Sequence, residues 1–208
     1  MARAYYTHFP RTILWLVPGG TLEPSGAEPG ESVEIDSFYL SKSPITNEQL
    51  EAFDPGFERS PLAPDDSDPA LGVSFELARD YAAWYAEVSR KPMRLASAAE
   101  WTHAALGGDP ASPWGEGAAD EHLWHSGNSP DDRLPPLDGR RSNGYGLFGM
   151  LGGAWEWVVD GDGEGVLLGG SFEQPLEVIT PWLRWPRETS TALPATTTFR
   201  IARGLRRG

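Results

Sequence analysis

Helix-forming sequence is confined to the first half of this chain, and no other feature limits its possible folds so strongly. Residues 74–90 place apolar side chains at helical spacing behind Ser74, a residue type that caps helices. The stretches TNEQ at 46–49 and SAAE at 97–100 have the spacing of capping boxes, which predicts further helix starts there. After residue 108 helical periodicity stops, so the second half is expected to fold as strands and loops.

The remainder of the chain is punctuated by glycine and proline, and its apolar runs are short. Strands are predicted at 154–159, 166–172, 180–186 and 197–203, after an earlier one within 31–40. The 24 glycines, 19 prolines and 9 tryptophans indicate short elements and ordered loops anchored by aromatic side chains. Early helices and scattered short strands make an α+β fold. No repeat or linker divides the chain, so we expect residues 1–208 to form a single domain.

Charge and hydropathy restrict the partners of the chain. Its formal net charge of −13 argues against nucleic acid and against an anionic membrane as partners. The apolar run Ile13–Val17 is too short for the apolar region of a signal peptide, and no later run could span a bilayer, so we expect a cytoplasmic protein. The absence of cysteine excludes disulfides, thiolate metal sites and a cysteine nucleophile.

A series of motifs carries a family resemblance over nearly the whole chain. In order they are VPGG at 17–20, IDSFYLSKSPITNEQLEAF at 35–53, GVSFELARDYAAWYAEVSRKPMRLASAAEWTHAALGG at 72–108, PWGE at 113–116, SNGYGLFGMLGGAWEWVVD at 142–160, LLGGSF at 167–172 and FRIARG at 199–204. Together they resemble the formylglycine-generating enzyme, or sulfatase-modifying factor, family. The resemblance implies a C-type-lectin-like fold with two main helices, short antiparallel strands and much irregular loop.

The chemistry of that family is missing from this sequence. The resemblance implies that oxidase members hold copper(I) with paired cysteines shortly after the GGS motif, because soft thiolates suit that ion. Here the segment at 172–188 reads FEQPLEVITPWLRWPRE, with Gln174 near the position of the first cysteine. We therefore expect no copper and no copper-dependent oxidase activity. Another kind of enzyme stays open, although the sequence favours a role without catalysis.

The histidines offer one alternative metal site. Some relatives in the superfamily resemble iron-dependent sulfoxide synthases, which need histidine ligands. EHLWH at 121–125 places His122 and His125 three residues apart beside Glu121. Such spacing is also common in an ordinary exposed loop, so both interpretations stay open.

The turn GLFGMLGGAWEW at 146–157 is glycine-rich and contains a single carboxylate, Glu156. By family resemblance it is a structural calcium loop, in which the carbonyl groups of Leu151, Gly152 and Ala154 and the carboxylate of Glu156 would supply hard oxygen ligands. The alternative is that Glu156 accepts hydrogen bonds from the backbone amides of its own turn. The resemblance also matches Arg94 and Arg200 to family arginines, for which we expect ion pairs, with Glu100 as one candidate partner.

The C-terminal segment is the predicted ligand face. Tryptophan together with arginine is the usual composition of a recognition hot spot. The candidate ligand-binding residues are Ser171, Phe172, Glu173, Gln174, Trp182, Arg184, Trp185 and Arg187. At least one of the two tryptophans is expected to pack in the core instead.

These observations favour a non-catalytic binding module for a protein or small-molecule ligand. One version is the variable protein of a diversity-generating retroelement, in which residues 171–198 would occupy the hypervariable place. A second version is an adaptor or sensor for an effector encoded nearby. The rival hypothesis is a metal-dependent oxidoreductase of the same superfamily with a non-cysteine site.

Overall fold

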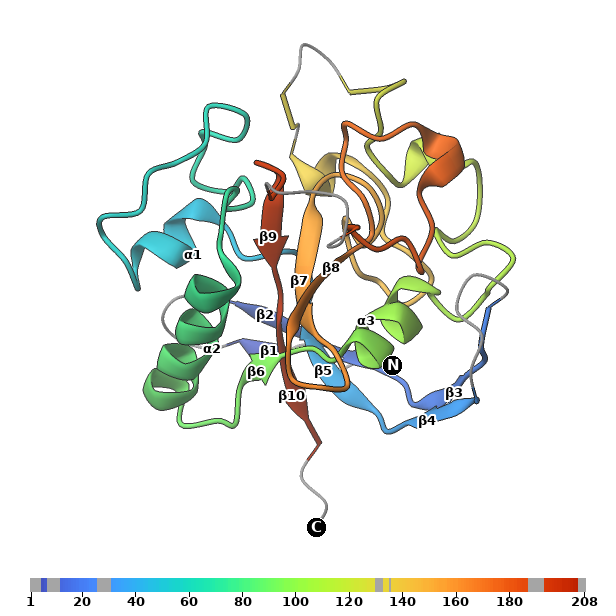
Figure 1. Cartoon of the computed structure of the whole chain (residues 1–208), viewed down its shortest axis with the longest axis horizontal. Helices are drawn as coiled ribbons and strands as arrows, with labels where there is room; N and C mark the ends of the chain where they lie inside the picture. Colours follow the sequence, from blue (N-terminus) through green and yellow to red (C-terminus); the bar gives the residue numbers. More distant parts are fainter. Residues whose placement is uncertain are drawn as a thin grey trace.

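The central sheet joins the two ends of the chain. The structure, a computed structural model, describes residues 5–6, 12–25, 31–129, 133–134, 136–186 and 193–205. The sheet has five antiparallel strands in the order β1 (Tyr5–Tyr6), β2 (Ile13–Val17), β5 (Phe38–Ser41), β10 (Ile201–Gly204) and β6 (Arg94–Leu95). Because β10 lies between β5 and β6, the C-terminal strand connects the two halves of the sequence (Figure 1).

Two smaller sheets flank this one. The hairpin of β3 (Gly20–Leu22) and β4 (Val33–Ile35) is antiparallel. The third sheet has the order β8 (Gly165–Leu168), β7 (Trp155–Val159) and β9 (Thr197–Phe199). The pairing of β7 with β9 is parallel, which differs from the expected antiparallel arrangement. Only Arg200 separates β9 from β10, so the chain passes directly from the three-stranded sheet into the five-stranded sheet.

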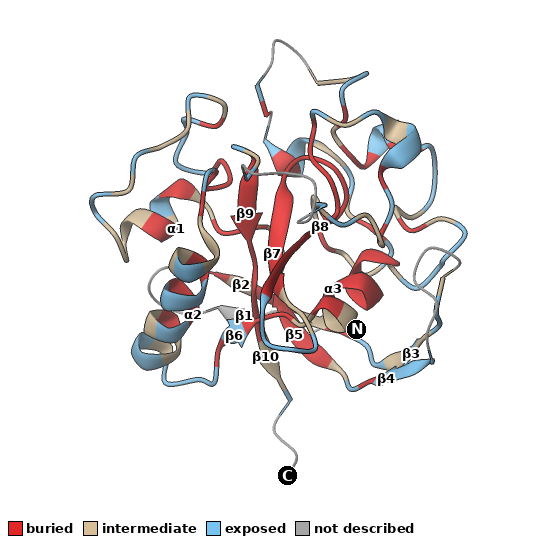
Figure 2. Ribbon diagram, in the orientation of Figure 1, coloured by how far each residue is buried: buried red, intermediate tan, exposed pale blue. Residues whose placement is uncertain are grey.

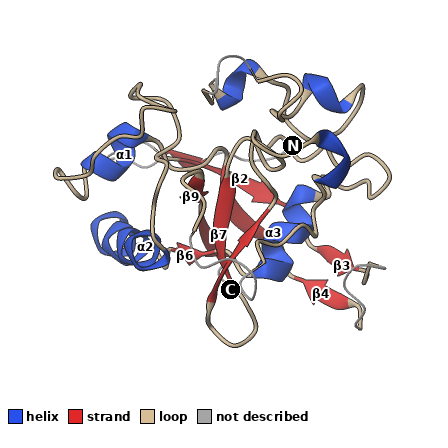
Figure 3. Cartoon of the chain, turned by 45° about the horizontal axis from the view of Figure 1, so that its top comes forward, coloured by secondary structure: helices blue, strands red, loops and turns tan. Residues whose placement is uncertain are grey.

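The helices begin where the sequence predicts. They are α1 (Asn47–Glu51), α2 (Phe75–Ser89) and α3 (Ala98–Ala105), with 3₁₀ turns η1 (Ala119–Glu121), η2 (Leu137–Gly139) and η3 (Leu176–Val178). Both predicted capping boxes form, with Thr46 before α1 and Ser97 before α3, and Ser74 caps α2. Figure 3 shows α2 and α3 on opposite sides of the central strands.

Several predicted strands are shorter or absent. The strand predicted at 166–172 ends at Leu168, because Gly169 and Gly170 adopt φ of 92° and 79° and turn the chain away. The one predicted at 197–203 is interrupted at Arg200. The one predicted at 180–186 is wrong: a single bridge joins Arg184 to Leu168 there. Strands β1, β2, β3 and β6 were not predicted.

The core lies on both sides of the β7–β9 sheet, and Figure 2 shows buried residues concentrated along these strands and α3. One cluster packs around Trp101 of α3 and a second around Tyr81 and Tyr85 of α2, and a third, smaller cluster contains Leu134 and Phe172. Within the described residues, no helix is long and apolar enough to cross a membrane.

Candidate functional site

Glu156 is completely buried at the second position of β7. The Nε of Arg200 donates to both of its carboxylate oxygens at 2.9 Å, and the indole Nε1 of Trp101 donates to Oε2 at 2.8 Å. The expected ion pair of Arg200 is confirmed, with Glu156 rather than Glu100 as its partner. Burial raises the pKa of Glu156 and lowers that of Arg200, and the attraction between the two groups opposes both shifts.

The glycine turn does not satisfy Glu156 with its own amides, so that alternative is wrong. The amide of Gly152 donates to the carbonyl oxygen of Gly169 at 3.0 Å, and that of Gly153 donates to the carbonyl oxygen of Trp124 at 3.0 Å. A side chain at Gly152 would collide with the same Trp124 carbonyl group, which explains the glycine. The turn therefore holds the backbone at Gly169 and the backbone at Trp124 against itself through these two hydrogen bonds.

Calcium ligation by Leu151, Gly152, Ala154 and Glu156 stays a prediction. The fit of the carboxylate is poor, because its two oxygens already accept hydrogen bonds from a guanidinium and an indole. A divalent cation bound there would lie beside the buried positive charge of Arg200. Ligation through Glu156 would require this pair to separate.

His122 has no ring nitrogen left for a metal. Its Nδ1 lies 3.0 Å from the carbonyl oxygen of Ser142, and its Nε2 lies 2.8 Å from that of Glu116. Both neighbours are acceptors, so each ring nitrogen points at a backbone carbonyl oxygen, and a metal ion would have to displace one of these carbonyl groups.

His125 is occupied in the same way. Its Nε2 lies 2.5 Å from Oδ1 of Asp120, and its Nδ1 accepts a hydrogen bond from the amide of Gly127 at 3.1 Å. Among the described residues, no group of three histidine, aspartate or glutamate side chains is arranged to hold a metal ion. The predicted iron site at His122 and His125 therefore has no donor atom available in this structure.

The candidate ligand-binding residues do not lie on one surface. Ser171 and Phe172 are buried, whereas Glu173 is exposed and lines a pocket of 340 Å³ with Phe172. Trp182 and Arg184 line a different depression of 360 Å³, which we call the Trp182 groove. Arg187 lies outside the described residues.

Trp185 belongs to the core. Its ring meets that of Trp155 edge to face, with centroids 5.4 Å apart. Its amide donates to the carbonyl oxygen of Leu167 at 3.0 Å, while the amide of Gly169 donates to that of Leu183 at 3.0 Å. Segment 183–185 therefore runs along the outer edge of β8, and alternation turns Trp185 inward. The expectation that one tryptophan packs in the core is confirmed.

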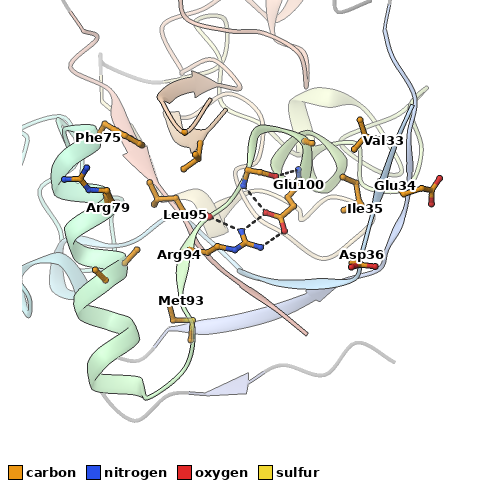
Figure 4. Close-up of a pocket in the computed structure, with 16 residues that line it drawn as sticks. Val33, Glu34, Ile35, Asp36, Phe75, Arg79, Met93, Arg94, Leu95 and Glu100 are labelled. Atoms are coloured by element: carbon orange, nitrogen blue, oxygen red, sulfur yellow. Dashed lines mark hydrogen bonds and ion pairs between the residues drawn. The ribbon is translucent and has the colours of Figure 1, made fainter. Parts of the chain in front are cut away.

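One large cavity among the described residues was not predicted from the sequence. It has a volume of 770 Å³ and lies between α2, β4, β6 and the first turn of α3, and we call it the α2–β4 cleft (Figure 4). Arg94 and Glu100 both line it and are in direct contact: Arg94 donates to the two carboxylate oxygens at 2.6 and 2.7 Å. This confirms the expected pair. The RLASAAE motif at 94–100 was the available sequence signal for this cleft, but it gave no indication of the walls that α2 and β4 supply.

Glu100 is held in its ionised form. Burial opposes the charge, but the guanidinium of Arg94 and the amide of Ser97, which donates at 2.9 Å, together lower the pKa of Glu100 below its ordinary value of 4.5. Because each charge has its partner, this pair does not require a charged ligand.

The sulfatase-modifying factor enzyme 1-like domain family matches residues 6–205. The chain belongs to this family. Among curated relatives of this family, the formylglycine-generating enzyme of Bos taurus is 31% identical over 112 residues, which cover 44% of this chain. The match spans 27% of the length of the bovine enzyme, so it concerns only part of that protein.

Two solved structures share the fold over nearly the whole chain. PvdO from Pseudomonas aeruginosa superimposes with a TM-score of 0.78 at 20% identity, covering 98% of both chains. Treponema denticola variable protein 1 superimposes with a TM-score of 0.75 at 15% identity, covering 98% of this chain and 99% of that one. The sulfatase-modifying factor domain described here therefore has the expected α+β, C-type-lectin-like fold.

At the position where the family resemblance implies the first copper cysteine, this member of the family has an internally bonded amide. The side-chain oxygen of Gln174 accepts hydrogen bonds from the backbone nitrogen of Ser171 at 2.7 Å and from its Oγ at 2.8 Å. The carbonyl oxygen of Gln174 accepts from the amide of Ser126 at 2.9 Å. These bonds give Gln174 a structural role in the turn.

Proposed function

We propose that this sulfatase-modifying factor domain is a non-catalytic binding module for a protein or small-molecule ligand. The observation that carries the proposal is the contrast between two parts of the C-terminal segment. Gln174 accepts hydrogen bonds within its own turn from Ser171, whereas Trp182 lines an open groove, with Arg184 beside it. A half-buried tryptophan beside an arginine supplies large contact area together with directional donors.

The scaffold supports recognition by holding this segment in place. The hydrogen bonds of segment 183–185 to β8 fix its backbone, so Trp182 and Arg184 project from an ordered support. Preorganisation of this kind lowers the entropy lost on binding.

The absence of oxidase chemistry is tested with purified protein. Copper(I) titration and oxygen consumption with a thiol-containing peptide should both give the values of a blank. Elemental analysis accompanies them. Stoichiometric iron or copper, or oxygen uptake, would overturn the proposal and favour the rival metal-dependent oxidoreductase.

The binding surface is tested by selection from a displayed random-peptide library. Selected binders should weaken on Trp182→Ala and on Arg184→Ala. Arg141→Ala is the control, since Arg141 is an exposed arginine outside the groove. Equal binding to all three variants would place recognition elsewhere.

Two biological settings fit such a module. The fold shared with Treponema denticola variable protein 1 favours a variable protein of a diversity-generating retroelement, with residues 171–198 as the varying segment. A template repeat and a reverse transcriptase gene beside this gene would support that setting. An effector gene beside this gene, in the absence of a template repeat and a reverse transcriptase gene, would support an adaptor or sensor in the cytoplasm.

A further inference from the structure

We propose that the α2–β4 cleft and the Trp182 groove form one continuous site for an extended peptide segment of a partner protein, in which aliphatic and basic side chains alternate. The inference rests on the proposed binding function and names its ligand class. It also moves most of the contact area away from the C-terminal segment to α2 and β4.

The two depressions adjoin each other. Val33, Ser97, Ala99 and Val159 line both of them, so the two volumes meet at these four residues. Val33 is 44% exposed at this junction, so its side chain is accessible to a ligand. The two depressions have volumes of 770 and 360 Å³, which together give room for several side chains of a chain segment.

The walls of the cleft are apolar. Val33 and Ile35 share one face of β4, while Glu34 lies on the other face and accepts a hydrogen bond from Thr21 at 2.6 Å (Figure 4). Apolar wall residues from the other elements are Phe75, Ala82, Ala83, Met93 and Leu95. Such a lining contributes to affinity through burial of aliphatic side chains.

The Arg94–Glu100 pair adds no unpaired charge of its own to this apolar surface. Each carboxylate oxygen of Glu100 accepts from the guanidinium, and the second oxygen also accepts from Ser97. A ligand can therefore cover the pair without breaking it.

The charges around the site favour a basic ligand. Apart from Glu34 and the Arg94–Glu100 pair, acidic lining residues still outnumber basic ones: Glu23, Glu31, Asp36 and Asp160, against Arg79 and Arg184. The turn between β7 and β8 adds Asp162 and Glu164, and Oδ1 of Asp160 accepts from their amides at 3.0 and 2.9 Å. This ordered acidic turn reaches both depressions through Gly161 and Gly163, so it can attract a basic side chain that spans the junction.

The test uses a synthetic peptide of alternating leucine and arginine, labelled with fluorescein, and fluorescence anisotropy with the intact protein. Ala83→Arg blocks the cleft from α2 and adds a positive charge. Val88→Arg is the matched control, because Val88 is 50% exposed on the same helix and does not line either depression. We expect Ala83→Arg to weaken binding by about tenfold or more and Val88→Arg to leave it nearly unchanged.

Peptides of different charge extend the test. Replacing arginine by glutamate in the peptide should abolish binding, and a leucine–glutamine peptide should bind more weakly. Equal loss for Ala83→Arg and Val88→Arg would overturn the inference, since it would indicate attraction to the acidic surface as a whole. Failure of the leucine–arginine peptide to bind would also overturn it. Library-selected peptides sensitive to Trp182→Ala but not to Ala83→Arg would overturn this inference while leaving the proposed function intact.

Discussion

Arg200 and Glu156 form a fully buried ion pair in which one guanidinium nitrogen lies 2.9 Å from both carboxylate oxygens. The same guanidinium donates to the carbonyl oxygen of Ser41 at 3.0 Å and to that of Phe148. Trp101 of α3 supplies a further donor to Glu156. One arginine at the junction of β9 and β10 thus ties together β5, β7, α3 and the glycine-rich loop.

Breaking this pair from one side should destabilise the protein strongly. Arg200→Met leaves the carboxylate of Glu156 buried with only Trp101 as a donor, and we expect a loss of about 3–5 kcal/mol in the free energy of unfolding. Urea denaturation followed by tryptophan fluorescence measures it.

The control is the double variant Glu156→Leu with Arg200→Met. Because both charges are then gone, it should be more stable than Arg200→Met alone. A single variant as stable as the wild type would contradict the role of the pair.

Local signals in the sequence predicted the helices well, because a cap and its first turn are neighbours in the chain. Thr46 and Ser97 each accept a hydrogen bond from the amide three residues later, as their spacing indicates. The pairing of Glu156 with Arg200 crosses 44 residues, and no local rule selects it over the expected Glu100. Sequence could identify these charged residues but could not assign their partners.

The candidate site was predictable only in part for a related reason. Composition singled out the tryptophans and arginines of 182–187, but which of them face outward depends on the hydrogen bonds of segment 183–185 to β8. The α2–β4 cleft is built from segments far apart in the chain, and each looks ordinary by itself.

Arg90 ends α2 in a left-handed conformation with φ of 54°, which disfavours a residue with a side chain. Arg90→Gly should therefore stabilise the protein by about 0.5–1 kcal/mol, after allowing for the greater freedom of glycine in the unfolded chain. Thermal unfolding measures the gain. Lys91→Gly is the control and should not be stabilising, and a lower melting temperature for Arg90→Gly would contradict the prediction.

The Arg94–Glu100 pair should make stability depend on pH. The pKa of Glu100 is lowered in the folded protein, so its contribution is present above 4.5, its ordinary value, and is lost as the pH falls through the folded-state pKa. Arg94→Leu should cost about 1 kcal/mol near neutral pH, because Arg94 is partly exposed. The difference from wild type should shrink in acid. Arg79→Leu, which removes a solvent-exposed pair with Asp80, is the control, and a difference independent of pH would contradict the assignment.

Calcium should not stabilise the protein through Glu156. The carboxylate is already neutralised by Arg200, so the melting temperature in calcium should equal that in a chelating buffer. Magnesium at the same ionic strength controls for screening. A calcium-specific rise in melting temperature would favour the calcium loop instead and would require Glu156 or the carbonyl groups of its turn to take up a different arrangement.

The two tryptophans of the C-terminal segment should separate stability from recognition. Trp185→Ala removes the edge-to-face contact with Trp155 and should lower the free energy of unfolding by about 2 kcal/mol, less than for a fully buried tryptophan because Trp185 is half-buried. Trp182→Ala removes a groove residue outside the core clusters and should cost about 1 kcal/mol or less. Urea denaturation of both variants, paired with binding of library-selected peptides, measures the contrast. A Trp182→Ala variant that is as destabilised as Trp185→Ala would make the groove tryptophan a packing residue and would remove the main support for recognition at this surface.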